Sequence, residues 1–383
     1  MSRSLKFIIV VLPLIFSMCK KKTTLEKASE LIEKGRYLQA IKEVKKGLLK
    51  DSLNANLYIQ LCQAYIGADS LLKASNIFLD LYNLDSTKAD NEKLKIYLAE
   101  FLGLEPYKTT RITRTRSNEF GPYPTSSGVY FASYRGGRSN IYRLTAGKIR
   151  RIIKGGGWNS NPVPVSGGLC YSSGFDRAEE IYLYDFKTRR KKRLTNNEEG
   201  DYPSAVNGKG DKLLFLSHVD GDWDIYLMDL TTGEQRAVTR NDHLDGDATF
   251  TPDEKRIIFV SKIEGAERIV ISDLKGKIKE VLPIPEGRHP SFVDSGRIIY
   301  QAKGGRDWDL YLYDLKARKR LILTRNKRED YRPRTDFRNK RVYFVRKIRR
   351  QWDIHMIDLN LPIETERLIE EIKMLTGREK EVS

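Results

Sequence analysis

A ten-residue stretch recurs three times in the second half of this 383-residue chain. It is written "GDWDIYLMDL" from Gly221, "RDWDLYLYDL" from Arg306 and "RQWDIHMIDL" from Arg350. Looser copies bring the number to six, and their strand-like cores start 40, 44, 44, 41 and 44 residues apart, at Ile141, Ile181, Ile225, Ile269, Leu310 and Ile354. A fixed period of this length indicates a fold built from repeated supersecondary units.

Each unit has the pattern of four short strands. An apolar run such as "KLLFLS" from Lys212 precedes each core, and a polar turn such as "HVDGDWD" from His218 joins the two as a hairpin. A segment with a proline precedes most of these pairs, and a short strand ending in Leu-Thr or Val-Thr follows several of them. Four strands in a unit of this length are typical of a β-propeller blade, so the sequence predicts a six-bladed propeller over residues 107–360.

The sixth unit has no Leu-Thr strand of its own, and the tail that follows it, residues 361–383, is predicted to turn helical. Ahead of the first unit, the stretch "YKTTRITRT" from Tyr107 to Thr115 has the pattern of a fourth strand that belongs to no preceding blade. We therefore expect this stretch to pair with the sixth blade and to close the ring, which removes two open sheet edges.

Residues 20–106 are predicted to form helices, because apolar residues recur at steps of three and four. The stretch from Gly35 aligns with the stretch from Asp69 at a shift of 34 residues, which places Ala40 on Ala74. A 34-residue helix–turn–helix unit with a small residue at the helix crossing resembles the tetratricopeptide repeat. The resemblance implies a groove for peptides or partner domains, and a plain helical spacer is the alternative.

The first 19 residues have the features of an export signal. Arg3 and Lys6 precede a ten-residue apolar run from Phe7, which is too short to span a membrane, since a span needs about 20 residues. The residues "FSMC" resemble the bacterial lipobox, and this resemblance implies acylation of Cys19. Ordinary cleavage and an uncleaved anchor are the alternatives. We expect an exported lipoprotein on the periplasmic face of the cell envelope.

The net charge of +18, from 69 Lys and Arg against 51 Asp and Glu, favours contact with anionic surfaces. For an exported protein these are anionic lipid or lipopolysaccharide, and we expect no specific nucleic acid. The basic stretches "RRKKR" from Arg189 and "RKIRR" from Arg346 belong to this surplus. A solvated basic surface that keeps a monomer soluble is the alternative reading.

The composite unit, "LT…DYP…GDKLLFLS…DGDWDIYLMDL", resembles the WD40-like propeller repeat of the TolB family. The resemblance covers Tyr107 to Leu359 and is weaker in the fourth unit, where Ala248 replaces the proline. It implies a six-bladed propeller in the cell envelope that binds proteins around its central channel. The expected fold class is therefore α+β multidomain, with a short all-α helical repeat followed by an all-β propeller.

The sequence offers little support for an enzyme. Serine peptidases with similar propellers need a G-x-S-x-G motif, which this sequence lacks. Oligogalacturonate lyases with a similar fold have a histidine-rich metal site, whereas the four histidines here are not expected to converge: His218, His243, His289 and His355. The aspartate-rich turns at 220–224 and 242–247 lack the loop length and distal Glu of an EF-hand. We expect no enzymatic activity, no metal and no cofactor.

The first strands of the six units are expected to meet at one mouth of the channel. The candidate partner-binding residues there mix acids, bases and aromatics: Asp201, Tyr202, Asp247, Arg288, His289, Asp330, Tyr331 and Arg332. Tyr and Arg dominate the binding energy of protein interfaces, so this mixture favours protein recognition. Charges that merely hold water in the channel are the alternative for any single residue.

Trp223, Trp308 and Trp352 occupy one repeated position and are expected to be buried between blades rather than stacked on a ligand. The sequence as a whole predicts a non-catalytic scaffold that binds envelope proteins through the channel mouth and the helical-repeat groove. Its alternative is a binding protein for a small ligand, a glycan or a peptidoglycan fragment in the channel.

Overall fold

The computed structural model describes residues 22–135, 137–155, 157–175, 179–219 and 221–377. The chain divides into two compact units, one with the residues up to 94 and those from 372 onward, the other with residues 95–371. The candidate acylation site Cys19 and the apolar run before it lie outside the described residues. Within the described ranges, no helix is long and apolar enough to cross a membrane.

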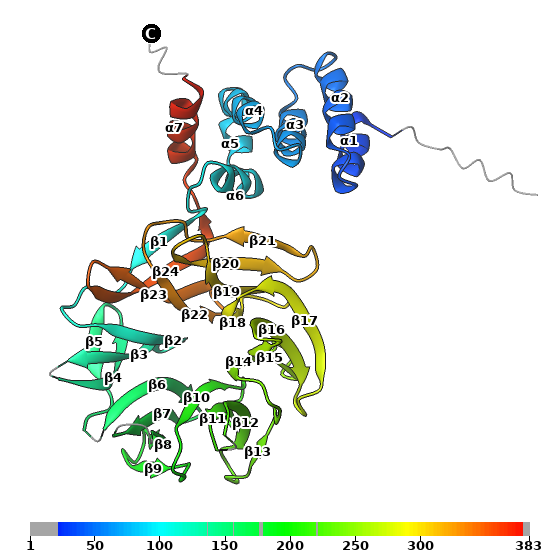
Figure 1. Cartoon of the computed structure of the whole chain (residues 1–383). Helices are drawn as coiled ribbons and strands as arrows, with labels where there is room; N and C mark the ends of the chain where they lie inside the picture. The colour runs from blue at the N-terminus through cyan, green and yellow to red at the C-terminus, as the bar shows by residue number, and fades with distance from the viewer. Residues whose placement is uncertain (1–21, 136, 156, 176–178, 220, 378–383) are drawn as a thin grey trace, which may run out of the picture. The chain divides into compact units, whose positions relative to one another are not determined.

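Among the described residues, six helices precede the first strand and a seventh follows the last one (Figure 1): α1 (Thr24–Glu33), α2 (Tyr37–Leu48), α3 (Ala55–Gly67), α4 (Leu71–Leu84), α5 (Ser86–Ala89), α6 (Glu92–Phe101) and α7 (Thr365–Thr376). Helix α1 begins at a capping box. The Thr23 hydroxyl accepts a hydrogen bond from the Glu26 N–H, and the Glu26 carboxylate accepts one from the Thr23 N–H. The helix predicted in the tail is confirmed by α7.

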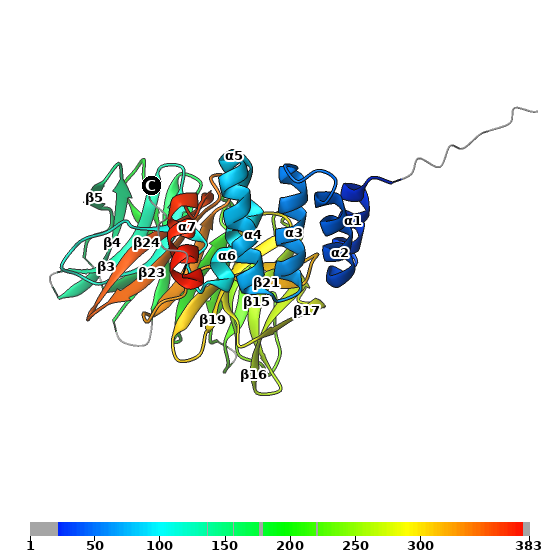
Figure 2. The same cartoon turned by 90° about the horizontal axis from the view of Figure 1, so that it is seen from above.

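The helices of the N-terminal unit lie in pairs. Figure 1 and Figure 2 both show α1 beside α2 and α3 beside α4. Helices α2 and α4 begin at residues 37 and 71, which matches the shift found in the sequence. The aligned Ala40 and Ala74 are both fully buried, as a close helix crossing requires. The predicted repeat of a helix–turn–helix unit is therefore confirmed.

Residues 95–371 hold six four-stranded antiparallel sheets, arranged as blades around a central axis (Figure 1). Blades one to three are β2 (Glu119–Thr125), β3 (Gly128–Arg135), β4 (Arg138–Thr145) and β5 (Lys148–Arg151); β6 (Trp158–Val165), β7 (Gly168–Gly174), β8 (Glu180–Asp185) and β9 (Lys191–Arg193); and β10 (Asp201–Val206), β11 (Lys212–Ser217), β12 (Asp224–Asp229) and β13 (Gln235–Ala237).

Blades four to six are β14 (Asp245–Phe250), β15 (Arg256–Ile263), β16 (Ala266–Asp273) and β17 (Ile278–Pro285); β18 (Arg288–Phe292), β19 (Arg297–Lys303), β20 (Trp308–Asp314) and β21 (Lys319–Ile322); and β22 (Asp330–Asp336), β23 (Arg341–Ile348) and β24 (Gln351–Pro362) with β1 (Tyr107–Arg111). In the first five blades the four strands follow one another in chain order. The predicted fold, a helical repeat followed by a six-bladed propeller, is confirmed.

The core of the propeller consists of six hydrophobic clusters, one between each pair of neighbouring blades. Each cluster contains at least one almost fully buried aromatic ring from the second strand of a blade; these rings include Phe131, Tyr171, Phe215, Phe259, Tyr300 and Phe344. Both faces of a second strand are covered by a neighbouring blade. This is why the sequences of these strands are continuous apolar runs, without the alternation of apolar and polar residues found in a sheet with one face in water.

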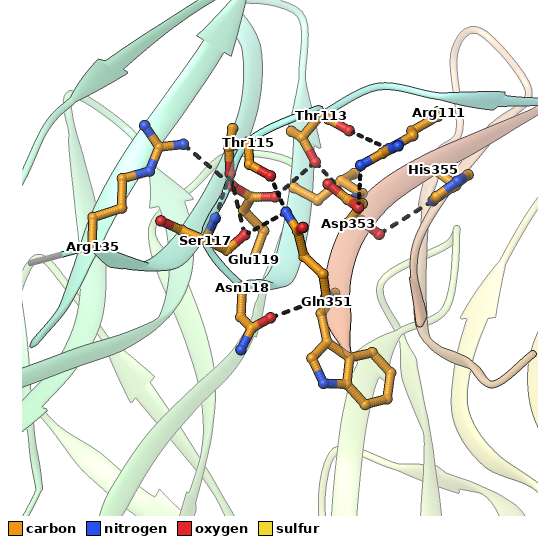
Figure 3. A network of polar contacts seen from close by, with 12 residues as sticks. Arg111, Thr113, Thr115, Ser117, Asn118, Glu119, Arg135, Gln351, Asp353 and His355 are labelled. Carbon is orange, nitrogen blue, oxygen red and sulfur yellow. Dashed lines mark hydrogen bonds and ion pairs between the residues drawn. The ribbon is translucent and has the colours of Figure 1, made fainter. Parts of the chain in front are cut away.

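Strand β1 closes the ring by pairing antiparallel with β24, with Thr109 opposite Ile357 and Arg111 opposite His355. The predicted closure is confirmed, although the strand is shorter than the stretch from Tyr107 to Thr115. Beyond β1, the N–H groups of residues 112 and 113 both donate to the carbonyl of Ile354. Figure 3 shows the polar network around this junction, in which the Thr113 hydroxyl contacts Glu119 at 2.8 Å.

Candidate partner-binding site

The innermost strand of every blade has a shift in its pairing register with the second strand. Six equivalent residues stand at or beside this shift and all of them line one cavity: Gly121, Asn161, Pro203, Asp247, His289 and Arg332. All except Pro203 have a positive φ, between 48° and 56°. Asn, Asp and His adopt this left-handed conformation more readily than most residues, so Arg332 is the strained exception.

The cavity has a volume of about 920 Å³. Six aromatic side chains contribute to its wall: Phe120, Tyr123, Tyr202, Trp223, Tyr331 and Trp352. Blades one to three add neutral hydroxyl and amide groups: Ser139, Ser160, Asn161 and Ser204. Blades four to six add the ionisable groups: Asp245, Asp247, His289, Arg332 and Arg334. One side of the cavity is therefore neutral and hydrogen-bonding, while the other side is charged.

Asp247 and His289 form a close pair on the charged side. Asp247 Oδ1 lies 2.7 Å from His289 Nδ1, and the His289 backbone N–H donates to Asp247 Oδ2 at 3.3 Å. Burial raises the pKa of Asp247, but His289 and the guanidinium groups of Arg332 and Arg334 outweigh burial and lower the pKa to about 2. The carboxylate is therefore ionised at neutral pH and forms a fixed negative charge in the cavity.

Two guanidinium groups supply the positive charge. Arg334 Nη2 donates to the carbonyl of Ser204 at 2.9 Å, and its guanidinium lies 5.7 Å from the centre of the Tyr123 ring. The Arg332 backbone N–H donates to Gln301 Oε1 at 3.0 Å, while its side chain is exposed and makes no hydrogen bond or salt bridge within the described ranges. Its donors are therefore available to a bound molecule.

The aromatic side chains of the wall contact one another in two groups. Tyr331 and Trp352 lie with ring centres 5.1 Å apart, and Phe120 lies 6.3 Å from Trp352. Tyr202 and Trp223 lie 5.5 Å apart on the third blade. The prediction that Trp223, Trp308 and Trp352 are buried between blades is wrong, because all three are only half-buried. Trp223 and Trp352 line the cavity.

Five of the eight candidate residues line the cavity and three do not. Tyr202, Asp247, His289, Tyr331 and Arg332 belong to the wall. Arg288 instead pairs with Glu267, and its guanidinium lies 4.9 Å from the centre of the Trp308 ring. Asp201 and Asp330 are fully buried. They precede wall residues in their strands, and successive side chains of a strand point to opposite faces.

The two buried aspartates belong to a repeated structural motif. In the pattern Thr-x-Asn-x-x-x-Asp, the amide of Asn197 donates to Asp201 at 2.7 Å and the amide of Asn326 donates to Asp330 at 3.2 Å. The fourth blade repeats the contact, since Asn241 donates to Asp245 at 2.9 Å. These carboxylates hold the loop that leads into each first strand. The pattern is visible in the sequence and would have identified Asp201 and Asp330 as structural residues.

The wall residues that were not among the candidates include Tyr123, Trp223, Arg334 and Trp352. Arg334 stands two positions after Arg332 on the same strand, so the alternation of a strand could have found it. The basic stretches are also partly structural, since Arg193 pairs with Glu180 at 2.7 Å and Arg346 pairs with Asp330 at 2.7 Å. Among the described residues, no group of three or more His, Cys, Asp or Glu side chains is placed to hold a metal ion.

Comparison with known proteins finds a family match for part of the propeller. Residues 164–335 match the family of the TolB β-propeller domain. The structure of TolB from Acinetobacter baumannii has 23% identity and a TM-score of 0.51, with 58% of each chain covered. An oligogalacturonate lyase from Vibrio parahaemolyticus has 14% identity and a TM-score of 0.48, with 66% of this chain and 94% of the lyase covered.

A puromycin-hydrolyzing peptidase from Mycobacterium tuberculosis has 15% identity and a TM-score of 0.46, with 60% of this chain and 42% of the peptidase covered. No curated protein matches the chain. At 23% identity, the Acinetobacter TolB structure shows a similarity of fold alone. The chain spans little more than half the length of the Acinetobacter TolB structure, 58%.

Proposed function

We propose that this chain, part of which matches the TolB β-propeller domain, is a non-catalytic scaffold of the cell envelope. It binds partner proteins at the channel mouth. The observation that supports it best is the cavity of about 920 Å³, whose wall combines six aromatic side chains with the exposed side chain of Arg332. Trp, Tyr and Arg side chains in a partly desolvated pocket are the residues that contribute most to protein–protein binding energy. The helical-repeat groove is a second surface for the same role.

The electrostatics of the cavity support a binding role over a catalytic one. A general base works best when its pKa lies near the operating pH. The pKa of Asp247 is lowered to about 2, because His289 and two guanidinium groups outweigh the effect of burial, so its carboxylate is a weak base. A carboxylate held in this way orients His289 and a bound partner. An exported lipoprotein, acylated at Cys19, would present this site on the periplasmic face of the envelope.

The test is retention of envelope proteins by the full chain, with a matched pair of variants. Arg318 also has a positive φ, 53°, but lies in the β20–β21 turn and is not one of the residues that line the cavity, so R318A controls for loss of an arginine at a strained position. We expect R332A combined with Y331A to lose the retained protein, since hot-spot truncations cost about 2 kcal/mol or more each. R318A should retain it.

Equal retention by both variants would contradict the proposal. Retention by the wild type that disappears at high salt would also contradict it, because screening by salt would then identify the net charge of +18 as the cause.

One observation favours a second candidate, the binding of a small ligand, a glycan or a peptidoglycan fragment. Small-molecule sites typically measure about 300–1,000 Å³, and the cavity of about 920 Å³ has a neutral wall with Ser139, Ser160 and Asn161. Such hydroxyl and amide groups suit a polyhydroxylated ligand. A saturable rise in melting temperature with a saccharide, lost in a variant with S160A and N161A, would support this candidate over the scaffold.

A further inference from the structure

The loop between α2 and α3 exposes two large apolar side chains. Leu49 is 88% exposed and Leu53 is 74% exposed. A leucine side chain left in water forgoes the favourable free energy of burying its apolar surface. We refer to residues 45–53, which include both leucines, as the α2–α3 tip. Exposed apolar side chains grouped in this way mark a surface that another apolar phase covers.

Cationic side chains flank the two leucines. Lys46 and Lys50 are exposed, and Lys45 is exposed with its ammonium 5.8 Å from the centre of the Tyr65 ring. The tip has one acidic residue, Asp51, whose carboxylate accepts a hydrogen bond from the Asn54 amide at 2.9 Å. Apolar side chains beside lysines are the composition that binds the interface of an anionic membrane, with the ammonium groups at the phosphates.

The helical repeat itself does not require these residues. The second unit, aligned at the 34-residue shift, has other side chains at the positions of Lys46, Leu49 and Leu53: Asp80, Asn83 and Thr87. The buried alanine of the repeat is present in both units, so the packing is kept while the tip differs. The apolar and cationic tip is therefore a property of the first unit alone.

The tip lies at the end of the α1–α2 pair where the described chain begins. A Cβ atom at Gly47 would stand 2.8 Å from Thr24 Cγ2, so the end of α2 touches the start of α1. Cys19 precedes Thr24 by only five residues, and five extended residues reach at most about 18 Å. An acyl chain on Cys19 would hold the tip close to the membrane surface, together with the basic residues Lys20 to Lys22.

We propose that the α2–α3 tip docks on an anionic bilayer, with Leu49 and Leu53 in the headgroup region and Lys46 and Lys50 at the lipid phosphates. Membrane attachment is more stable with two signals than with one, such as an acyl chain and a basic apolar surface. The tip supplies the second signal and orients the helical unit with its α2–α3 end toward the membrane. This role is independent of the channel and of the function proposed for it.

The test places an environment-sensitive fluorophore on the tip of the full chain. Cys62 and Cys170 are buried free thiols, so a C19S and L53C chain has one reactive thiol. We expect higher, blue-shifted emission with vesicles that contain phosphatidylglycerol and little change with phosphatidylcholine alone. The control probe is L38C, because Leu38 is 78% exposed but lies at the opposite end of α2 from the tip. Along the helix axis Leu38 is roughly 16 Å from Leu49, at 1.5 Å per residue.

Second-site variants of the labelled chain separate the two parts of the proposal. L49S should reduce the affinity for anionic vesicles roughly tenfold, which corresponds to about 1.4 kcal/mol. Replacing Lys46 and Lys50 by glutamate should abolish the preference for anionic lipid. An equal response from probes at 38 and 53, or no response at 53, would overturn the proposal. Emission that rises with protein concentration without vesicles would overturn it as well, because a second copy would then cover the tip.

Discussion

The hydroxyl of Thr113 accepts a hydrogen bond from the backbone N–H of Ile354 at 2.8 Å, across 241 residues of chain. The same contact occurs within blades, where the hydroxyls of Thr195, Thr239 and Thr324 each accept from a third-strand N–H at 2.9 Å. Strand β1 therefore joins the sixth blade with the hydrogen bond that the repeated Leu-Thr and Val-Thr strands make to their own blades. This contact explains why threonine ends the fourth strand.

An arginine two residues before the threonine makes equivalent contacts in the closing strand and in the fourth strand of the second blade. Arg111 donates to the Thr113 carbonyl at 3.0 Å and to Asp353 at 2.7 Å (Figure 3). In the second blade, Arg193 donates to the Thr195 carbonyl at 2.8 Å and to Glu180 at 2.7 Å. The closing strand thus has the side chains of a fourth strand as well as its backbone pairing.

We expect T113V to destabilise the propeller by about 1–3 kcal/mol, since the Ile354 N–H and the Glu119 carboxylate both lose a buried partner. Urea unfolding, followed by near-ultraviolet circular dichroism, measures this change. T110V is the control on the same strand, because Thr110 is exposed and its substitution should stay within about 0.5 kcal/mol. Equal stabilities for the two variants would show that closure does not depend on the threonine.

The Arg346–Asp330 ion pair should behave as a buried one. Arg346 Nε and Nη2 donate to the two Asp330 oxygens at 2.7 and 2.9 Å, and the side chains are 7% and 0% exposed. R346M should cost about 3–5 kcal/mol because it strands a buried carboxylate, and R346M with D330L should cost less than R346M alone. R341M removes a half-exposed partner of Asp358 and should cost about 1 kcal/mol or less. A double variant with a lower free energy of unfolding than R346M would contradict this expectation.

The fold was predictable because a period repeated six times outweighs local exceptions. The fourth blade has Ala248 where other blades have proline, yet Ala248 and Phe250 are buried in the cluster shared with the third blade. The pattern of apolar second strands survives in all six units, and this pattern is what the packing between blades requires. The closing strand was predictable for the same reason, because a missing strand at one end matched a surplus strand at the other.

The channel wall was predictable only in part. Neighbouring residues of a first strand face opposite ways, which separates Asp330 from Tyr331, and the positive φ at Arg332 then changes the direction of the strand. A positive φ at an arginine cannot be predicted from a single sequence, because arginine rarely adopts this conformation. Trp352 is half-buried because its ring contacts the ring of Tyr331. Tyr331 lies on β22, which is separated from β24, the strand of Trp352, by β23.

Asp309 should make the propeller less stable as the pH rises. Burial, together with the nearby charge of Asp330, raises the pKa of Asp309 to about 7 from an ordinary value of 3.8. The folded state therefore holds a proton between these two values that the unfolded chain has lost. Its contribution to stability is complete below about pH 4 and is lost as the pH rises toward 7. D309N should lose this dependence in urea titrations from pH 4 to 8, and D222N should keep it.

His355 should act in the opposite direction. Burial and the charge of Arg346 lower the pKa of His355 to about 4 from 6.5, and the neutral ring contacts the carbonyl of Asp353 at 3.2 Å. The unfolded chain binds a proton between these values that the folded state does not, so stability falls as the pH drops from 6.5 toward 4. H355F should flatten this part of the profile, whereas H243F should leave it unchanged. An unchanged slope in H355F would assign the acid sensitivity to another group.

The Asp247–His289 pair should protect the cavity against acid. Burial raises the pKa of Asp247, but His289, Arg332 and Arg334 together lower it to about 2, below the ordinary value of 3.8. The ionised carboxylate therefore contributes stability that is complete above about pH 4 and is lost as the pH falls toward 2.

H289L removes the ring that contacts the carboxylate, so the pKa of Asp247 should rise and part of this contribution should already be lost at pH 4. Carbon-13 NMR of labelled aspartate carboxylates measures the titration, with the D247N spectrum assigning the signal. A signal that titrates at the same pH in H289L and in the wild type would mean that Arg332 and Arg334 alone hold the carboxylate ionised. Those arginines would then be engaged with Asp247, and Arg332 would have less of its positive charge to offer a bound partner.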